Sequence, residues 1–94
     1  MSVLDAFSLA GRVALIPGGG GAIGTAMSLA LADAGAKIAA ANHTLDSAEA
    51  CAASVRAAGG EAIAIEMDAT DEASCERAVA ATVQAFGKVD LVVN

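Results

Sequence analysis

Short apolar runs alternate along the chain with segments in which apolar residues recur at helical spacing. Four such runs predict strands, at residues 13–16, 37–41, 62–65 and 91–93. Runs of this length, bounded by glycine or polar residues, are typical of strands that are covered on both faces of a parallel sheet. The elements therefore follow the order β-α-β-α-β-α-β, which predicts an α/β fold.

Three helices are predicted between these strands, from the spacing of apolar residues and from end signals. Gly35 and the pair Gly59-Gly60 end the first two helices. Asp46, with Glu49 three residues on, resembles a capping box for the second helix, and Thr70 is the predicted N-cap of the third. The predicted apolar faces are Ile23, Met27, Ala30, Leu31 and Ala34 in the first helix, Ala48, Cys51, Val55 and Ala58 in the second, and Cys75, Val79, Val83 and Phe86 in the third.

Right-handed crossovers restrict how these parallel strands can be ordered. If the second and third strands step outward from the first, and the fourth returns to its other side, a crevice opens over the carboxyl end of the first strand. We therefore predict a Rossmann-like parallel sheet of order 3-2-1-4 with helices on both faces. The third helix then lies opposite the first two, and a ligand binds at the crevice.

A glycine-rich turn, residues 18–24, joins the first strand to the first helix. Glycines at this place allow a tight turn, a close approach of the backbone to a pyrophosphate, and close packing of helix on strand. The N–H groups at the helix start, near Ile23 and Gly24, and the helix dipole attract a phosphate. This geometry explains how an acidic protein can bind an anionic cofactor.

Three motifs compete for this turn. A phosphate loop of the nucleoside triphosphatase kind is a poor match, because no lysine follows Gly24. The pattern G-x-G-x-x-G fits at Gly19, Gly21 and Gly24, whereas the longer G-x-x-x-G-x-G fits at Gly18 and Gly24 with Ala22 at its middle glycine. The alternative is a flexible turn without a ligand, but its place between strand and helix favours a phosphate site.

The chain resembles the short-chain dehydrogenases/reductases in four blocks that follow in the order of that family. The blocks are residues 7–16, the turn Gly18-x-x-x-Ala22-Ile23-Gly24, residues 67–71 and residues 86–94. The resemblance identifies residues 1–94 as the N-terminal part of a single NAD(P)-binding Rossmann domain. It implies an NAD(P)-dependent oxidoreductase that transfers a hydride between the cofactor and a small alcohol or ketone, and we expect the full-length enzyme to be a homo-oligomer.

The same resemblance assigns roles to individual residues of the cofactor site. Gly18, Gly24 and the backbone at Ile23 would line the pyrophosphate, and Asp68 would hydrogen-bond the adenine amino group. Asn94 matches the first asparagine of the family's Asn-Asn-Ala-Gly block. Altogether the expected cofactor-binding residues are Gly18, Gly20, Gly21, Ile23, Gly24, Asn42, His43, Thr44, Asp68, Ala69 and Asn94.

Residues 42–44, at the end of the second strand, bear on the choice between NAD and NADP. An acidic residue there would bind the ribose hydroxyls of NAD, but this chain has Asn42-His43-Thr44. Asn42 and Thr44 can donate hydrogen bonds and His43 can add partial positive charge, so we predict a preference for NADP(H). An exposed loop histidine without a role is an equal alternative for His43.

Two departures from the family, Pro17 for threonine and Ala22 for glycine, would weaken cofactor binding if they have any effect.

Composition excludes other classes of function. The chain has 5 Lys and Arg against 11 Asp and Glu, a net charge of −6, so we expect no nucleic-acid partner. No apolar stretch reaches the length of a membrane span and no signal peptide is recognised, so we expect no membrane partner and a cytoplasmic location. Cys51 and Cys75 have no metal or redox spacing and are interpreted as reduced packing cysteines, with no metal site.

No catalytic residue is predicted in this chain. The family uses a Tyr-x-x-x-Lys pair and a nearby serine, but the chain has no tyrosine, its lysines are Lys37 and Lys88, and no serine follows Ser74. We therefore expect a fragment of a longer enzyme, and we expect the isolated chain to be poorly stable or to associate through the apolar edge at 91–93. Two alternatives stay open: a non-catalytic nucleotide-binding module and a nonfunctional truncated product.

Overall fold

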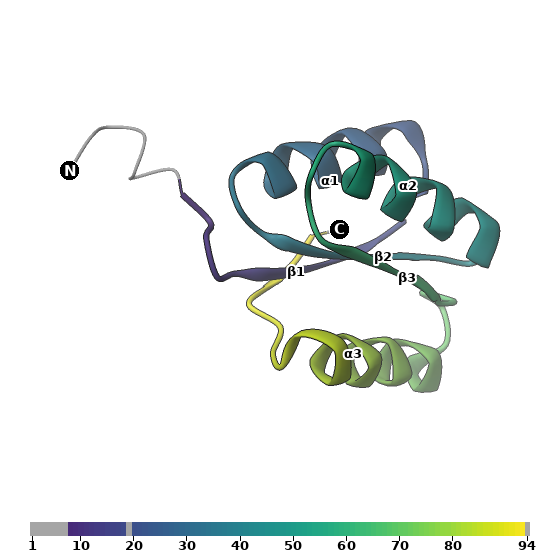
Figure 1. Ribbon diagram of the computed structural model, residues 1–94. Helices are drawn as coiled ribbons and strands as arrows, with labels where there is room; N and C mark the ends of the chain where they lie inside the picture. The colour runs from purple at the N-terminus through teal and green to yellow at the C-terminus, as the bar shows by residue number, and fades with distance from the viewer. Residues whose placement is uncertain (1–7, 19, 94) are drawn as a thin grey trace.

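A parallel sheet of four strands separates two layers of helices (Figure 1). The computed structural model describes residues 8–18 and 20–93. The strand order β3-β2-β1-β4 confirms the predicted 3-2-1-4 order. Helices α1 and α2 cover one face of the sheet and α3 covers the other, as predicted (Figure 1). In chain order the elements are β1 (Val13–Pro17), α1 (Ala22–Asp33), β2 (Lys37–Asn42), α2 (Leu45–Ala57), β3 (Ala62–Glu66), α3 (Glu72–Phe86) and β4 (Leu91–Val92).

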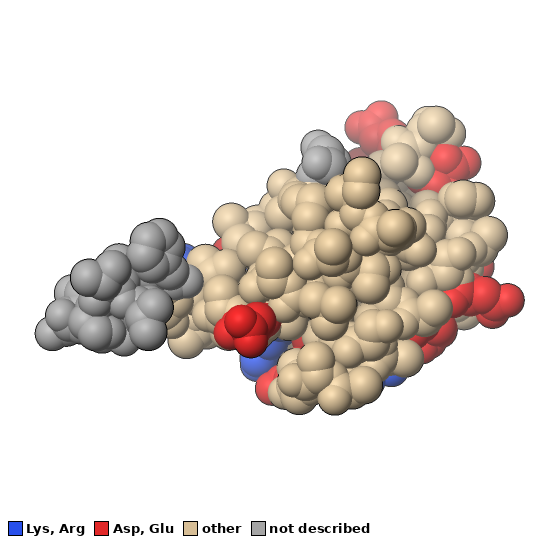
Figure 2. Space-filling view, turned by 90° about the horizontal axis from the view of Figure 1, so that it is seen from above, with Lys and Arg blue, Asp and Glu red and all other residues tan. Residues whose placement is uncertain are grey.

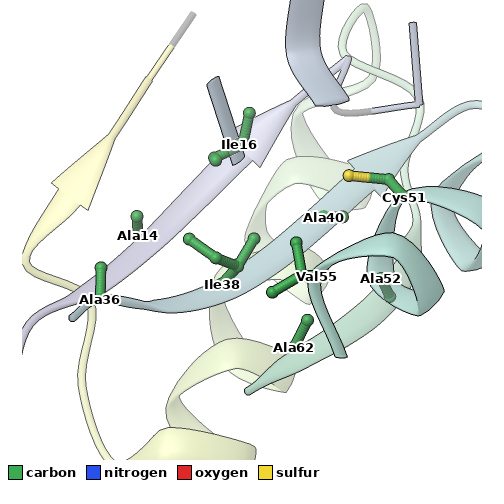
Figure 3. Close-up of a cluster of buried hydrophobic side chains, with 9 residues drawn as sticks. All are labelled: Ala14, Ile16, Ala36, Ile38, Ala40, Cys51, Ala52, Val55 and Ala62. Carbon is green, nitrogen blue, oxygen red and sulfur yellow. The ribbon is translucent and has the colours of Figure 1, made fainter. Parts of the chain in front are cut away.

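Strand β2 lies between β1 and β3 and carries the centre of the core. Its side chains alternate: Ile38 and Ala40 face the layer of α1 and α2, whereas Ala39 and Ala41 face α3. Figure 3 shows Ile16, Ile38 and Val55 as the larger side chains of a cluster otherwise made of alanines and Cys51. Few large side chains therefore fill this core, and each of them accounts for a large share of the apolar surface that is buried.

The predicted helix starts are off by one or two residues. The N-cap of α2 is Thr44 rather than Asp46, which lies inside the first turn, so the capping box is wrong. The N-cap of α3 is Asp71 rather than Thr70, because the Asp71 carboxylate accepts a hydrogen bond from the Ala73 N–H at 3.0 Å. The hydroxyl of Thr70 instead donates to Asp68 at 2.6 Å, which removes it from the cap.

The predicted apolar face of α1 is wrong at two residues, Ile23 and Ala30, which are both exposed. Ile23 is 78% exposed, and the buried residue of this helix is Ser28. Because most residues of α1 are apolar and occur on all its sides, periodicity does not distinguish its faces. A small residue turned to the sheet lets the helix lie close, and the Ser28 hydroxyl is satisfied by donating to the Gly24 carbonyl at 2.8 Å.

The predicted apolar face agrees with the structure better in α2 than in α3. In α2, Ala48, Cys51 and Val55 are buried as predicted, whereas Ala58 is exposed because it is the C-cap. In α3 the predicted stripe is wrong at Val79 and Val83, which are 41% and 42% exposed, whereas Cys75 is half-buried and packs against the core. The residues of α3 that are buried are the small ones, Ser74, Ala78 and Thr82.

No helix in the described part of the chain is both long enough and apolar enough to cross a membrane. On the outer strand β4, Leu91 and Val92 pair with Ala14 and Leu15 of β1. The side chain of Val92 is exposed, which agrees with the apolar edge expected at 91–93.

Asp90 joins the amino ends of β1 and β4. Its carboxylate accepts a hydrogen bond from the Val13 N–H at 2.9 Å, and its own N–H donates to the Val13 carbonyl, also at 2.9 Å. Lys88 lies 3.1 Å from this carboxylate and Arg12 lies 3.6 Å from it. The Val13 N–H, and after it Lys88, hold the pKa of Asp90 below its ordinary value, against the opposing effect of partial burial.

This lowered pKa makes the stability of the domain dependent on pH in the acid range. A carboxyl whose pKa is lower in the folded state stabilises the fold above its unfolded pKa, about 4, and loses that contribution as the pH falls through the folded value. We expect Asp90→Asn to lose less unfolding free energy than the unmodified protein between pH 5 and pH 2, measured by urea unfolding. Glu61→Gln, in the exposed pair with Lys37, is the control. An equal acid dependence in both variants would contradict this role.

Candidate functional site

Three segments converge at the carboxyl edge of the sheet, each following a different strand. They are the glycine-rich turn after β1, the residues that end β2 and begin the next loop, and the segment after β3. Together they line a cleft of about 350 Å³. The residues that line it are Gly18, Asn42, His43, Met67, Asp68, Ala69 and Thr70.

Five residues that the sequence marked as candidates therefore come together here: Gly18, Asn42, His43, Asp68 and Ala69. Met67 and Thr70 also line the cleft and were not among the residues predicted from the sequence. Their position directly beside the candidate pair after β3 was the available signal. Asn94 lies outside the described residues.

Gly18 fixes the path of the chain out of β1. Its φ of +75° is a left-handed conformation that glycine adopts without strain. Its N–H donates to the Ala41 carbonyl at 2.7 Å, and its carbonyl accepts from the Gly21 N–H at 3.3 Å. The turn is thus attached to the end of β2 and closed on itself.

Gly20 lies where the turn meets the start of α2. A Cβ built on Gly20 would lie 2.6 Å from Ser47 Cβ and 2.8 Å from the Ser47 carbonyl carbon, and it would also collide with the Asn42 side-chain nitrogen. At Gly21, by contrast, the nearest atom to such a Cβ is the Gly18 carbonyl oxygen at 3.9 Å. Gly20 therefore serves packing against Asn42 and Ser47, while Gly21 faces open space.

The amino end of α1 follows directly. Its N-cap is Gly21, which has no side chain, and its first turn has no acidic residue. The Thr25 N–H donates to the Gly21 carbonyl at 2.8 Å, and the exposed Ile23 side chain stands beside this end. A helix start of this kind presents N–H groups and the positive end of the dipole, so the turn fits a diphosphate.

Asp68 is an exposed carboxylate held by its neighbour. Thr70 donates to it twice, from its hydroxyl at 2.6 Å and from its N–H at 2.9 Å. These two bonds, the hydroxyl first, together with the nearby His43, hold the pKa of Asp68 below its ordinary value. The Asp68 N–H donates to the Ser74 hydroxyl at 2.9 Å, which ties the segment to α3. A carboxylate fixed in this way can accept a hydrogen bond from an amino group in the cleft.

The loop after β2 makes its own hydrogen bonds. Asn42 Oδ1 accepts from the His43 N–H at 2.8 Å and lies 2.9 Å from His43 Nδ1. The Thr44 hydroxyl donates to the Ser47 hydroxyl at 2.8 Å and does not line the cleft. Of the three candidates in this loop, the structure thus brings Asn42 and His43 to the cleft and leaves Thr44 at the start of α2.

The cations of the chain lie away from this cleft. Arg12, Lys37, Arg56 and Lys88 form ion pairs at or beside the amino ends of the strands. Arg77 is exposed on α3 and does not line the cleft. Figure 2 shows that the face formed by α1 and α2 is also largely uncharged. Among the residues that line the cleft, only His43 can carry positive charge.

Comparison with known proteins gives one consistent family. A family model described as short chain dehydrogenase matches residues 12–94. The chain is 43% identical over 86 residues to 2,5-dichloro-2,5-cyclohexadiene-1,4-diol dehydrogenase LinX of Sphingobium indicum, covering 92% of this chain and 34% of that protein. It is 41% identical over 86 residues to a sorbitol dehydrogenase of Cereibacter sphaeroides, covering 92% of this chain and 32% of that protein.

Solved structures agree. A 7α-hydroxysteroid dehydrogenase complexed with NADH and 7-oxo glycochenodeoxycholic acid matches 100% of this chain and 37% of its own, at 31% identity and a TM-score of 0.95. The chain thus spans about a third of the length of the curated relatives that it matches.

Proposed function

This chain belongs to the short chain dehydrogenase family, and from that premise we propose that the carboxyl edge of its sheet binds a nicotinamide dinucleotide. The observation that carries the proposal is the convergence of the glycine-rich turn, the Asn42-His43 pair and Asp68 on one cleft. In this proposal the diphosphate lies on the turn at the start of α1, and the adenosine lies in the cleft. The contributing residues are Gly18, Gly20, Gly21, Ile23, Gly24, Asn42, His43, Thr44, Asp68, Ala69 and Asn94.

Different residues of the chain would bind the diphosphate and the adenine of the cofactor. The uncapped amino end of α1 offers N–H groups and positive dipole charge to the diphosphate. The Asp68 carboxylate, fixed by Thr70, accepts a hydrogen bond from the adenine amino group, and Ala69 packs against the ring. When bound, the nicotinamide supplies hydride chemistry. The role of this chain is to bind and orient it.

We further propose that the complete protein is an oxidoreductase that acts on an alcohol or a carbonyl compound. The names of its relatives support this class, since they include dehydrogenases of a cyclohexadiene diol and of sorbitol. This chain contains no tyrosine, and we assign the proton transfer at the substrate oxygen to none of its residues. In the proposed enzyme these residues form the cofactor-binding part.

A preference for NADP(H) belongs to the same proposal. No carboxylate stands at residues 42–44 to repel a 2′-phosphate, and His43 can add positive charge there.

We also propose a cytoplasmic location. Its support is that Cys51 and Cys75 are both free thiols, as is usual in a reducing compartment.

Titration of the complete gene product with NADPH and NADH, followed by nicotinamide fluorescence, tests this function. We expect both to bind and NADPH to bind more tightly. Asn42→Asp should shift the ratio of the two dissociation constants toward NADH by about tenfold or more, because a carboxylate repels the phosphate and accepts from the ribose hydroxyls. Glu61→Gln, at the opposite edge, is the control and should leave the ratio unchanged. Binding of neither dinucleotide would overturn the proposed function, and tighter binding of NADH to the unmodified protein would overturn the preference alone.

A further inference from the structure

The contacts of Asn42 determine which nitrogen of the His43 ring carries a proton. Asn42 Oδ1 accepts from the His43 backbone N–H at 2.8 Å, so the atom that faces the loop is an oxygen. The same oxygen lies 2.9 Å from His43 Nδ1. Since a carbonyl oxygen can only accept, Nδ1 must be the protonated nitrogen of the neutral ring. Nε2, which bonds to none of the described residues, then has a lone pair and is an acceptor.

This arrangement gives Nε2 two opposite properties. On the neutral ring it accepts a hydrogen bond, which suits a ribose 2′-hydroxyl and disfavours the acceptor oxygens of a 2′-phosphate. On the protonated ring it becomes a charged donor, which suits the phosphate and no longer accepts from the hydroxyl. Nδ1 donates to Asn42 in both states, so the ring need not turn when it takes up a proton.

The titratable groups that surround His43 are all acidic. Asp68 faces it across the cleft, Glu66 pairs with Asn42 in the sheet register, and Asp46 lies in the first turn of α2. All three are carboxyl groups and cannot supply positive charge, whereas imidazole is the ordinary side chain that can gain a proton between about pH 5 and pH 8. No lysine or arginine lines the cleft in the described part of the chain, so a 2′-phosphate has no other side-chain cation there.

We propose that His43 is a specificity-determining residue whose protonation selects between a 2′-phosphate and a 2′-hydroxyl, and that Asn42 is the positioning residue that holds its ring. This rests on the proposed function, because it needs a dinucleotide in the cleft. The preference of the site is then a function of pH. The affinity for NADPH relative to NADH increases as the pH falls and decreases as the pH rises.

The test is the ratio of the dissociation constants for NADH and NADPH, measured on the complete gene product between pH 8.5 and pH 6.5. This range lies above the second pKa of a phosphate monoester, about 6, so the ligand keeps most of its charge. The ratio should rise about tenfold toward pH 6.5, because NADPH binding takes up a proton and NADH binding does not. His43→Gln keeps an amide that donates and accepts but cannot be protonated, so its ratio should stay flat.

Asn42→Ala separates positioning from charge. It keeps the imidazole but removes the acceptor for Nδ1, so the rise in the ratio should fall to less than about threefold. Thermal unfolding of both variants checks that they are folded. A profile in Asn42→Ala equal to that of the unmodified protein would overturn the positioning role, and a flat profile in the unmodified protein, or an unchanged slope in His43→Gln, would overturn the selection by His43. If neither dinucleotide binds at any pH, the proposed function itself fails.

Discussion

Gly20→Ala is expected to weaken dinucleotide binding by about tenfold or more and to lower the free energy of unfolding by about 1–3 kcal/mol. The added methyl group would collide with Asn42 and would lie 2.6 Å and 2.8 Å from two atoms of Ser47. The Asn42 side chain could move, but the Ser47 carbonyl carbon belongs to the backbone of α2. The turn or the helix must therefore shift, and both carry parts of the proposed site.

Gly21→Ala is the matched control, since a methyl group there meets no atom closer than 3.9 Å. Neither Gly20 nor Gly21 has a positive φ, so the comparison isolates the contact from backbone strain. We expect the free energy of unfolding of Gly21→Ala to stay within about 0.5 kcal/mol of the unmodified protein. Urea unfolding gives the stability, and NADPH titration gives the affinity. Equal stability losses in the two variants would show that the packing of Gly20 against α2 does not matter.

The strands and their order could be predicted because they depend on features that local sequence carries. Apolar runs such as residues 13–16 and 62–65 lie in the strands that the structure places at Val13–Pro17 and Ala62–Glu66. Parallel strands joined by right-handed crossovers then leave few topologies. The same rule predicted that residues after β1, β2 and β3 would meet, and Gly18, His43 and Asp68 do line one cleft.

The helix faces could not be predicted from periodicity, because alanine occurs on every side of these helices. The inward face of a helix depends on how closely the helix approaches the sheet. Small residues such as Ser28 and Thr82 are buried there because they allow a close approach. Both predicted caps were wrong for local reasons. Thr70 has the right chemistry for a cap, but its hydroxyl donates to Asp68 and the N-cap of α3 is Asp71, while the N-cap of α2 is Thr44, two residues before the predicted Asp46.

The contacts between residues of the site also could not be predicted from the sequence. Gly20 and Ser47 meet only because α2 begins beside the glycine-rich turn, which depends on the register of β1 and β2. The bond between Asn42 Oδ1 and His43 Nδ1 depends on rotamers that no motif specifies. Residue types at the strand ends thus indicate a dinucleotide, whereas the details that would discriminate between its forms require the folded structure.

Ile38→Ala should have the largest effect on stability, a loss of about 2–5 kcal/mol. Ile38 is 0% exposed at the centre of the sheet and is among the largest fully buried side chains. The cluster around it consists mostly of alanines, which are too small to move into the space that its removal leaves. Both the lost transfer free energy and the unfilled cavity therefore count against the variant.

Ile23→Ala makes the same chemical change at a side chain that is 78% exposed, and it should alter the free energy of unfolding by no more than about 0.5 kcal/mol. Both values come from urea unfolding of the complete gene product without cofactor, so that a contact of Ile23 with a dinucleotide does not enter. A large loss at Ile23 together with a small one at Ile38 would mean that the apolar face predicted by periodicity, rather than the face found in the structure, packs against the sheet. The difference between these two isoleucines therefore tests the placement of α1 as well as the core, and with it the orientation of the helix start on which the diphosphate is proposed to lie.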